Sequence, residues 1–260
     1  HAPGAAIGKR AVGSIGHAAI FSLGKGKHLN ALDGGLVSTL DSGFYEYLLK
    51  VLGSLEGPSR TTVAKKIAVV AAMGLLTKRV FFDVTLWPGL QLYASRGKDP
   101  LYENFEDVLE PPGPEGPSAA NRRLGPVQAQ LALSALQNFP KQLFRRRSLH
   151  EQLCESASSD VVIQQAREGT EPAPLEFVIK CSDRNEARHS LRKLGIDSQP
   201  TWMVCPQQLP AFREEAGNQY PIAKELSQQL LYLPFYPGLH AGDISRMAEL
   251  LSNPSQVAGL

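Results

Sequence analysis

The sequence predicts an α/β fold, because apolar runs of strand length alternate with helical patterns along the chain. The alternation is clearest from residue 173 onward, where EFVIKC at 176–181 reads as a strand and the next segment, at 184–195, as a helix that ends at Gly195. Hydrophobic residues make up 43% and charged residues 20% of the 260 residues, which is the composition of a soluble globular protein. This length accommodates one large domain or two modest ones.

The glycine-rich first 45 residues contain two further runs of strand length, AAIFSL at 18–23 and GGLVST at 34–39, which are bounded by turn residues and separated by a polar loop. A different composition follows, and FYEYLLKVLGSL at 44–55 has apolar side chains at helical spacing. The proline- and glycine-rich stretch at 111–118 ends this region as a linker.

The apolar run IAVVAAMGLL at 67–76 is too short to cross a bilayer, which needs about 20 residues. Basic residues flank it on both sides: Lys65, Lys66, Lys78 and Arg79. Two interpretations stay open. The run forms a buried helix, which we prefer, or it makes a peripheral membrane contact through residues 61–92.

The predicted elements after the linker are mostly helices. Apolar residues recur every three or four positions from 120 to 155, and Pro140 is expected to kink or divide that helix. The basic run Arg145–Arg147 reads as a solvated helix face rather than an anion site. We further expect a strand and two helices in the last sixty residues, at 201–205, from 222 until Pro234, and at 241–252.

The overall charge and the cysteines exclude several classes of protein. A net charge of +2 argues against nucleic acid as a partner, since no strong basic excess exists to neutralise phosphates. The three cysteines, Cys154, Cys181 and Cys205, are far apart and lack C-x-x-C spacing, so we expect no disulfide framework, no metal site and a cytoplasmic location. The chain starts at His1 without a visible signal peptide, and we interpret it as a fragment.

The segment VGSIGHAAIFSLGKGKHLNALDGGLVST at 12–39 carries the most chemistry. A strand ends at Ser22, a loop of small residues carries Lys25 and Lys27, and Gly34-Gly35 opens the next strand. Serine and lysine on such a loop can bind an anion, and a desolvated lysine can act as a nucleophile. From composition alone, a surface loop with two solvated lysines is the better interpretation.

The order of these residues resembles the active-site region of the DegT/DnrJ/EryC1/StrS family of sugar aminotransferases, which use pyridoxal 5'-phosphate. The family pattern is roughly G-S-x-G-D-A-A-x-F-S-F-x-x-x-K-x-L-x-x-G-E-G-G, and the spacing from Phe21 to Gly35 matches without a gap. The resemblance implies that Lys27, rather than Lys25, is the catalytic lysine that binds the cofactor covalently. It also implies that Ser22 bonds the cofactor phosphate.

Two more segments resemble the same family. ANRRLGPVQAQLALSALQ at 120–137 is similar to the helix N-Y-R-x-x-x-x-Q-A-A-x-G-x-x-Q-L, with Asn121, Arg123, Gln128 and Ala129 as shared positions. The family asparagine reaches the phosphate across a homodimer interface with shared active sites, and Asn121 would suit a helix N-cap equally well. Residues 192–202 and 220–251 are similar to the family's small domain, including its L-P-x-x-P-x-L motif from Leu233.

Several positions depart from the family pattern. His1 resembles the end of the cofactor-binding D-A-A-H motif, whose aspartate would then precede residue 1, so we expect this polypeptide to be incomplete for catalysis. His17 replaces an aspartate and Asp33 replaces a glutamate. Gln207 stands where many members have a substrate-contacting histidine, and with Arg123 it completes the candidate substrate residues.

The resemblance implies a fragment of the fold type I aminotransferase architecture. Residues 1–43 would end the large cofactor-binding domain, 44–118 would be a helical insertion with a linker, and 119–260 would form a connecting helix and a small α/β domain. The implied reaction moves an amino group, from glutamate, to a keto group of a nucleotide-linked sugar for polysaccharide or glycoconjugate biosynthesis. The alternatives are a sugar dehydratase with the same cofactor, in which histidine replaces the lysine, and a non-enzymatic interaction protein.

Overall fold

The computed structural model describes residues 2–76, 78–89, 92, 122–200 and 220–260. The chain divides into two compact units, His1–Tyr45 with Gln130–Leu260, and Glu46–Ala129. The predicted strand at 201–205 lies outside the described residues. The predicted division at residues 43 and 118 into functional domains stays a prediction.

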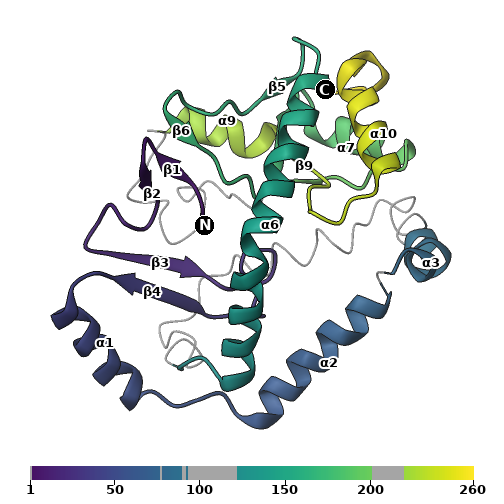
Figure 1. Cartoon of the computed structure of the whole chain (residues 1–260). Coiled ribbons are helices and arrows are strands. Elements are labelled where there is room, and N and C mark those ends of the chain that lie inside the picture. The colour runs from purple at the N-terminus through teal and green to yellow at the C-terminus, as the bar shows by residue number, and fades with distance from the viewer. Residues whose placement is uncertain (1, 77, 90–91, 93–121, 201–219) are drawn as a thin grey trace. The chain divides into compact units, whose positions relative to one another are not determined.

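The N-terminal part of the first unit contributes two small antiparallel sheets. The first has the strand order β2-β1-β6, with bounds β1 Ala6–Ile7, β2 Arg10–Ala11 and β6 Thr170–Glu171. The second is a hairpin of β3, Ala18–Ser22, and β4, Gly35–Thr39, which lie side by side in Figure 1. Its register pairs Ala18 with Thr39 and Ser22 with Gly35. The two strands expected in this region are therefore confirmed.

A four-stranded antiparallel sheet with the order β5-β7-β9-β8 forms the centre of the first unit. Its strands are β5 Val162–Ile163, β7 Phe177–Lys180, β8 Gln199–Pro200 and β9 Leu230–Leu233. Phe177 and Ile179 on β7 pair with Leu233 and Leu231 on β9, and all four side chains are buried in the main hydrophobic core. This cross-strand packing explains why the segment is a sheet.

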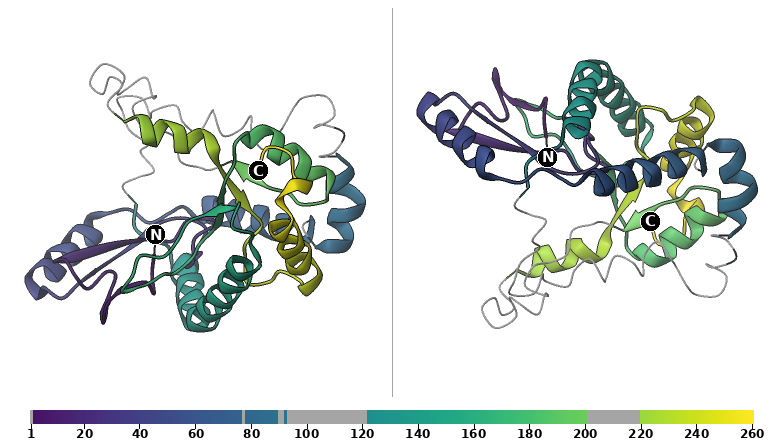
Figure 2. Two further views of the ribbon diagram at one scale, coloured as in Figure 1. Left: turned by 90° about the horizontal axis from the view of Figure 1, so that it is seen from above. Right: turned by 90° about the horizontal axis from the view of Figure 1, so that it is seen from below.

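The helices that cover this core are α6 Pro126–Ser156, α7 Arg184–Lys193 and α10 Ala241–Ser252. Figure 2 shows α7 and α10 on one side of the four-stranded sheet, with α9, Pro221–Gln229, extending away on the other. Asp183 caps α7 by accepting hydrogen bonds from the backbone N–H groups of Asn185 and Glu186. The predicted helices at 184–195 and 241–252 are confirmed.

The helix expected from residue 222 to Pro234 ends earlier in the structure. Helix α9 stops at Gln229, and Leu230–Leu233 form the strand β9. The prediction was wrong here because long-range pairing decides the conformation: these residues complete the ladder with β7, and three of the four are buried.

For α6, the expected division at Pro140 and the expected solvated basic face were wrong. The helix continues through Pro140, and the buried residues Leu143, Leu149 and Leu153 follow the proline. The basic run is not a solvated face, because Arg146 and Arg147 are partly buried and donate hydrogen bonds to backbone carbonyls. Hydrogen-bond acceptors that are distant in the sequence cannot be recognised from the local sequence pattern.

The second unit is helical over the residues described. Helix α1, Ser42–Ser54, begins in the first unit, and α2 Arg60–Leu76, α3 Arg79–Phe81 and the π-helical turn η1 Phe82–Leu86 follow. Asp41 and Ser59 start α1 and α2 by accepting hydrogen bonds from the backbone N–H groups of Phe44 and Thr62. The predicted helix at 44–55 is confirmed and begins two residues earlier.

The apolar run at 67–76 lies within α2, but the preferred expectation of burial is wrong within this chain. The exposed apolar side chains are Ile67, Val69, Val70, Leu75 and Leu76. At 100° per residue these positions surround the helix instead of forming one face. In the described part of the chain, no helix combines the length and the hydrophobicity that crossing a membrane requires.

Candidate functional site

The candidate site is the loop between β3 and β4, which carries Lys27. Backbone hydrogen bonds close the base of this loop, from Leu23 N to Gly34 O (2.9 Å) and from Ala31 N to Leu23 O (2.8 Å). Nearer the tip, Lys27 N donates to Gly24 O at 3.3 Å, and Gly26 has φ +72°, a conformation that costs glycine little. The position of Lys27 is thus set by a closed turn.

Buried side chains anchor the loop to the rest of the first unit. The buried apolar residues of the loop are Leu23, Leu29, Ala31 and Leu32. His28, next to Lys27, is also buried and packs edge-on against Phe139 of α6, with ring centroids 5.9 Å apart. In the tautomer protonated at Nε2, His28 donates to Ala173 O at 3.2 Å. Burial lowers the pKa of His28, which favours this neutral form.

The two lysines of the loop differ in exposure. Lys25 is fully on the surface, whereas Lys27 is half-buried beside the anchored His28. A half-buried amine is more readily desolvated than an exposed one, which is a condition for nucleophilic chemistry. This difference favours Lys27 over Lys25 as the reactive lysine.

Ser22 ends β3 at the same loop. It is half-buried, and its hydroxyl oxygen accepts a hydrogen bond from Gly24 N at 3.4 Å, so the hydroxyl proton is free to point to an anion. A Cβ added to its strand partner Gly35 would lie 3.3 Å from Phe21 O, so a side chain there would crowd the hairpin. The structure therefore brings Ser22 and Lys27 onto one loop, as the sequence predicted.

A group of charged residues near this loop was not predicted from the sequence. Glu176 lies just before β7 and is half-buried. Burial raises the pKa of its carboxyl, and the positive charges of Arg146 and Lys27 oppose that rise. Arg146 is itself held in place, because it donates to Leu175 O (2.8 Å) and Phe235 O (3.2 Å) and lies over the Phe235 ring. In the sequence, Glu176 is an acidic residue just before a predicted strand, and nothing there indicates that Arg146 and Lys27 affect its carboxyl.

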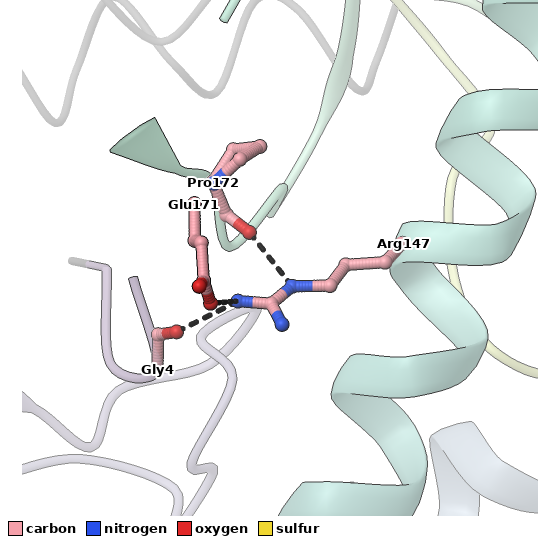
Figure 3. A network of polar contacts seen from close by, with 4 residues as sticks. All are labelled: Gly4, Arg147, Glu171 and Pro172. Atoms are coloured by element: carbon pink, nitrogen blue, oxygen red, sulfur yellow. Dashed lines mark hydrogen bonds and ion pairs between the residues drawn. The ribbon is translucent and has the colours of Figure 1, made fainter. Parts of the chain in front are cut away.

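A second arginine of α6 fixes the N-terminal segment (Figure 3). Arg147 donates to Gly4 O and to Pro172 O, both at 2.9 Å, and lies 3.7 Å from the Glu171 carboxylate. Gly4 has φ +80°, and a Cβ at this position would come within 2.5 Å of Leu143. The chain just after residue 1 is thereby held against α6, the helix that also contacts the Lys27 loop.

The remaining predicted site residues belong to the second unit or lie outside the described residues. Arg123 is exposed and belongs to the second unit, where its backbone N donates to Glu56 O at 3.0 Å. Gln128 is buried and accepts from Gly125 N at 3.2 Å, which caps the start of α6. His1, Asn121 and Gln207 lie outside the described residues.

Solved structures of aminotransferases have a similar fold, among them the following three. An aminotransferase of the DegT/DnrJ/EryC1/StrS type from Brucella abortus has a TM-score of 0.64 at 18% identity, over 95% of this chain and 53% of its own. DesI in the presence of its TDP-sugar product has a TM-score of 0.61 at 19% identity, over 97% and 53% of the two chains. The PLP-form of Spr1654 from Streptococcus pneumoniae, a sugar aminotransferase, has a TM-score of 0.61 at 16% identity, over 98% and 56%.

These similarities concern the fold, and the chain spans about half the length of each structure. They confirm the predicted α/β fold as a part of the aminotransferase architecture. No curated protein matches the sequence.

The family itself is identified by sequence. The model of the DegT/DnrJ/EryC1/StrS aminotransferase family matches residues 80–252, a range that starts downstream of the Lys27 loop and extends to the last residue of α10. This range is more than half of the 260 residues and includes the whole of the second and third segments on which the resemblance rests. The chain belongs to the DegT/DnrJ/EryC1/StrS aminotransferase family.

Proposed function

We propose that the protein is an aminotransferase that uses pyridoxal 5'-phosphate to transfer an amino group from glutamate to a keto group of a nucleotide-linked sugar. The observation that carries the proposal is the half-buried Lys27 on a closed, anchored loop that also bears Ser22. Membership of the aminotransferase family supports the reaction class. The nucleotide-linked substrate is supported by DesI, a protein of similar fold whose crystal structure was analysed in the presence of its TDP-sugar product.

The groups on the loop fit this cofactor chemically. A primary amine at Lys27 can bond an aldehyde carbon, and the Ser22 hydroxyl can donate a hydrogen bond to a phosphate oxygen. Arg146, fixed nearby by two backbone carbonyls, adds positive charge to the region. When bound, the cofactor supplies an electron sink for the carbanion that forms at the amino-bearing carbon.

The chain's own residues would then perform the proton transfer. Lys27 would bind the cofactor covalently at rest, and its free, unprotonated amine would carry the proton between the amino-bearing carbon of the substrate and the cofactor. His28 holds the lysine in place through its contact with Ala173 O. The buried loop residues exclude water from the base of the turn, which protects a carbanion from stray protonation.

The lysine at this position also distinguishes amino transfer from sugar dehydration. Dehydratases of the family were expected to carry histidine there, and this chain carries Lys27. A lysine can both bond covalently to the cofactor and transfer the proton. Amino transfer is therefore favoured over dehydration.

The test compares Lys27→Ala with Lys25→Ala in the full-length protein. Formation of 2-oxoglutarate from glutamate, dependent on a nucleotide-linked keto sugar, should fall by a factor of about 10²–10⁴ or more in Lys27→Ala, since general base catalysis contributes that much. Lys25→Ala, which removes an exposed amine two residues away, should stay near the wild-type rate. Equal loss in both variants, or loss only in Lys25→Ala, would contradict the assignment.

We further propose a homodimer with shared sites, in which Asn121 serves the cofactor phosphate of the neighbouring subunit. The proposal is supported by the Asn121 and Arg123 positions in the family helix pattern. Subunits with Asn121→Ala, mixed with subunits with Lys27→Ala, should recover part of the activity, because half of the heterodimer sites carry neither lesion. Demonstrated heterodimers without recovery would rule out sharing.

A further inference from the structure

The segment at 170–173 joins two parts of the first unit, the N-terminal strands and the Lys27 loop. Its first two residues form β6, which pairs with β1 in the small N-terminal sheet. At its other end, Ala173 O lies 3.2 Å from Nε2 of His28, the residue that follows Lys27. The N-terminal strands and the Lys27 loop therefore share one support.

Arg147 fixes this shared segment from α6. Its Nε donates to Pro172 O and its terminal Nη2 donates to Gly4 O, both at 2.9 Å, while Nη2 also lies 3.7 Å from the Glu171 carboxylate (Figure 3). A planar guanidinium holds two acceptors in a fixed relation, which a single ammonium group does not. Since Pro172 directly precedes Ala173, Arg147 fixes the backbone next to the carbonyl that the Lys27 loop uses.

An aromatic contact links the turn at Gly4 to the same histidine. A Cβ at Gly4 would lie 3.0 Å from Cζ of Phe139, so this turn packs directly against the Phe139 ring. The other side of the link is the edge-on contact of Phe139 with His28, whose ring centroids are 5.9 Å apart. The contacts thus form a closed network, which runs through Arg147, Gly4, Phe139, His28, Ala173 and Pro172.

We propose that Arg147 is a positioning residue for Lys27, which acts through this closed network on the loop that carries the lysine. The inference rests on the proposed function, in which Lys27 bonds the cofactor and carries a proton. Arg147 holds Pro172 O, and the neighbouring Ala173 O then meets His28 at a fixed place. Such support matters for proton transfer, because a misplacement of about 1 Å can lower a rate about 10²-fold.

The first test measures hydrogen–deuterium exchange in the full-length protein without cofactor. The amides of Leu23 and Ala31 report on the Lys27 loop, since their hydrogen bonds close its base. In R147M they should exchange about tenfold faster, because the loop opens more readily once a charged hydrogen-bond donor of the network is lost. The amides of β9, whose side chains pack into the main core, should keep their wild-type rates.

Two further variants make the exchange result decisive. R145M removes the same charge from an exposed position on α6 and is the matched control, in which loop exchange should not change. R147K keeps the charge without the planar guanidinium, so it should restore part of the protection. It also replaces R147M if that variant does not fold, as judged by circular dichroism. Loop exchange equal to that of R145M, in R147M or in its substitute, would overturn the proposal.

The second test separates positioning from a merely structural role. In the enzyme loaded with pyridoxal 5'-phosphate, R147M should lower kcat per bound cofactor about tenfold, while KM for the keto sugar stays within about twofold. A merely structural role would lower the amount of bound cofactor and leave kcat per bound cofactor at the wild-type value. That result would also overturn the proposal.

Hydrogen exchange does not depend on the cofactor, so the two proposals can fail separately. Faster loop exchange in R147M, in a protein whose Lys27 never binds pyridoxal phosphate, would support the action of Arg147 on the loop and contradict the proposed function. Unchanged loop exchange in R147M, in a protein that forms 2-oxoglutarate from glutamate, would overturn the role of Arg147 and support the proposed function.

Discussion

The four-stranded sheet and the β3–β4 hairpin, both in the first unit, are stabilised in different ways. Phe177 and Ile179 of the sheet are 0% and 1% exposed, because α6, α7 and α10 cover them. In the hairpin, Ile20 is 78% exposed, and burial is concentrated in the connecting loop, where Leu23 is 1% exposed. The hairpin is therefore anchored at one end only, and that end carries Lys27. The fold therefore stabilises the site by fixing its loop rather than its strands.

The largest effect should come from the centre of the sheet. Phe177→Ala leaves a cavity in the main core, and we expect it to lower the free energy of unfolding by about 3–5 kcal/mol. Ile20→Ala is the contrast, since an exposed truncation changes stability by about 0.5 kcal/mol or less. Urea denaturation followed by circular dichroism measures both. Similar losses in the two variants would show that the hairpin strands are also held by burial.

A smaller loss is expected from the anchored end of the hairpin. Leu23→Ala removes a buried side chain at the loop base and should cost about 2–3 kcal/mol. It should also weaken pyridoxal phosphate binding, because the turn that holds Lys27 loses its support. Leu36→Ala, on the exposed part of β4, is the matched leucine control and should leave both quantities nearly unchanged. If Leu36→Ala were the more damaging, the anchor would be misplaced.

Lowering the pH should produce the smallest of these losses of stability. It acts through two histidines whose side chains are removed from solvent, His28 in the Lys27 loop and His150 on α6. Burial lowers the pKa of both His28 and His150. The unfolded chain therefore binds these protons at higher pH than the folded chain, so the free energy of unfolding decreases as pH falls below the ordinary histidine value of 6.5. Urea midpoints between about pH 7.5 and about pH 5 measure the loss.

Replacing one of these histidines separates this effect from general acid sensitivity. His150→Gln should reduce the loss of stability at low pH, because a group that must be neutral to stay buried has been removed. His189→Gln changes an exposed histidine of α7 and is the control. An identical pH dependence in the two variants would show that His150 does not contribute.

Those parts of the fold whose conformation depends on residues close by in the sequence could be predicted from it. The helix at 241–252 and the helix capped by Asp183 follow from local spacing and capping. The strand at 230–233 could not, because its conformation depends on pairing with β7, fifty residues earlier in the chain. Nor could the continuous helix through Pro140, of which Leu149 and Leu153 pack into the main core with residues distant in the sequence.

The candidate site likewise contains residues that could be predicted from the sequence and residues that could not. Ser22 and Lys27 share a motif within one loop, and the motif alone identified them. Arg146 is fixed by tertiary contacts with Leu175 O and Phe235 O, so no spacing in the sequence relates it to Lys27. The basic run at 145–147 was visible, but the acceptors that its side chains find were not.

The central claim, that Lys27 is the lysine that binds the cofactor, has a direct test. The full-length protein is incubated with pyridoxal 5'-phosphate, its visible absorption band is recorded, and borohydride is added to make the lysine–cofactor bond permanent before peptide mapping. We expect borohydride to bleach the band and the pyridoxyl group to be found on Lys27. Lys27→Ala should lack the band, whereas Lys25→Ala should keep it. Modification of Lys25 with an unmodified Lys27, or a band that survives in Lys27→Ala, would contradict the claim.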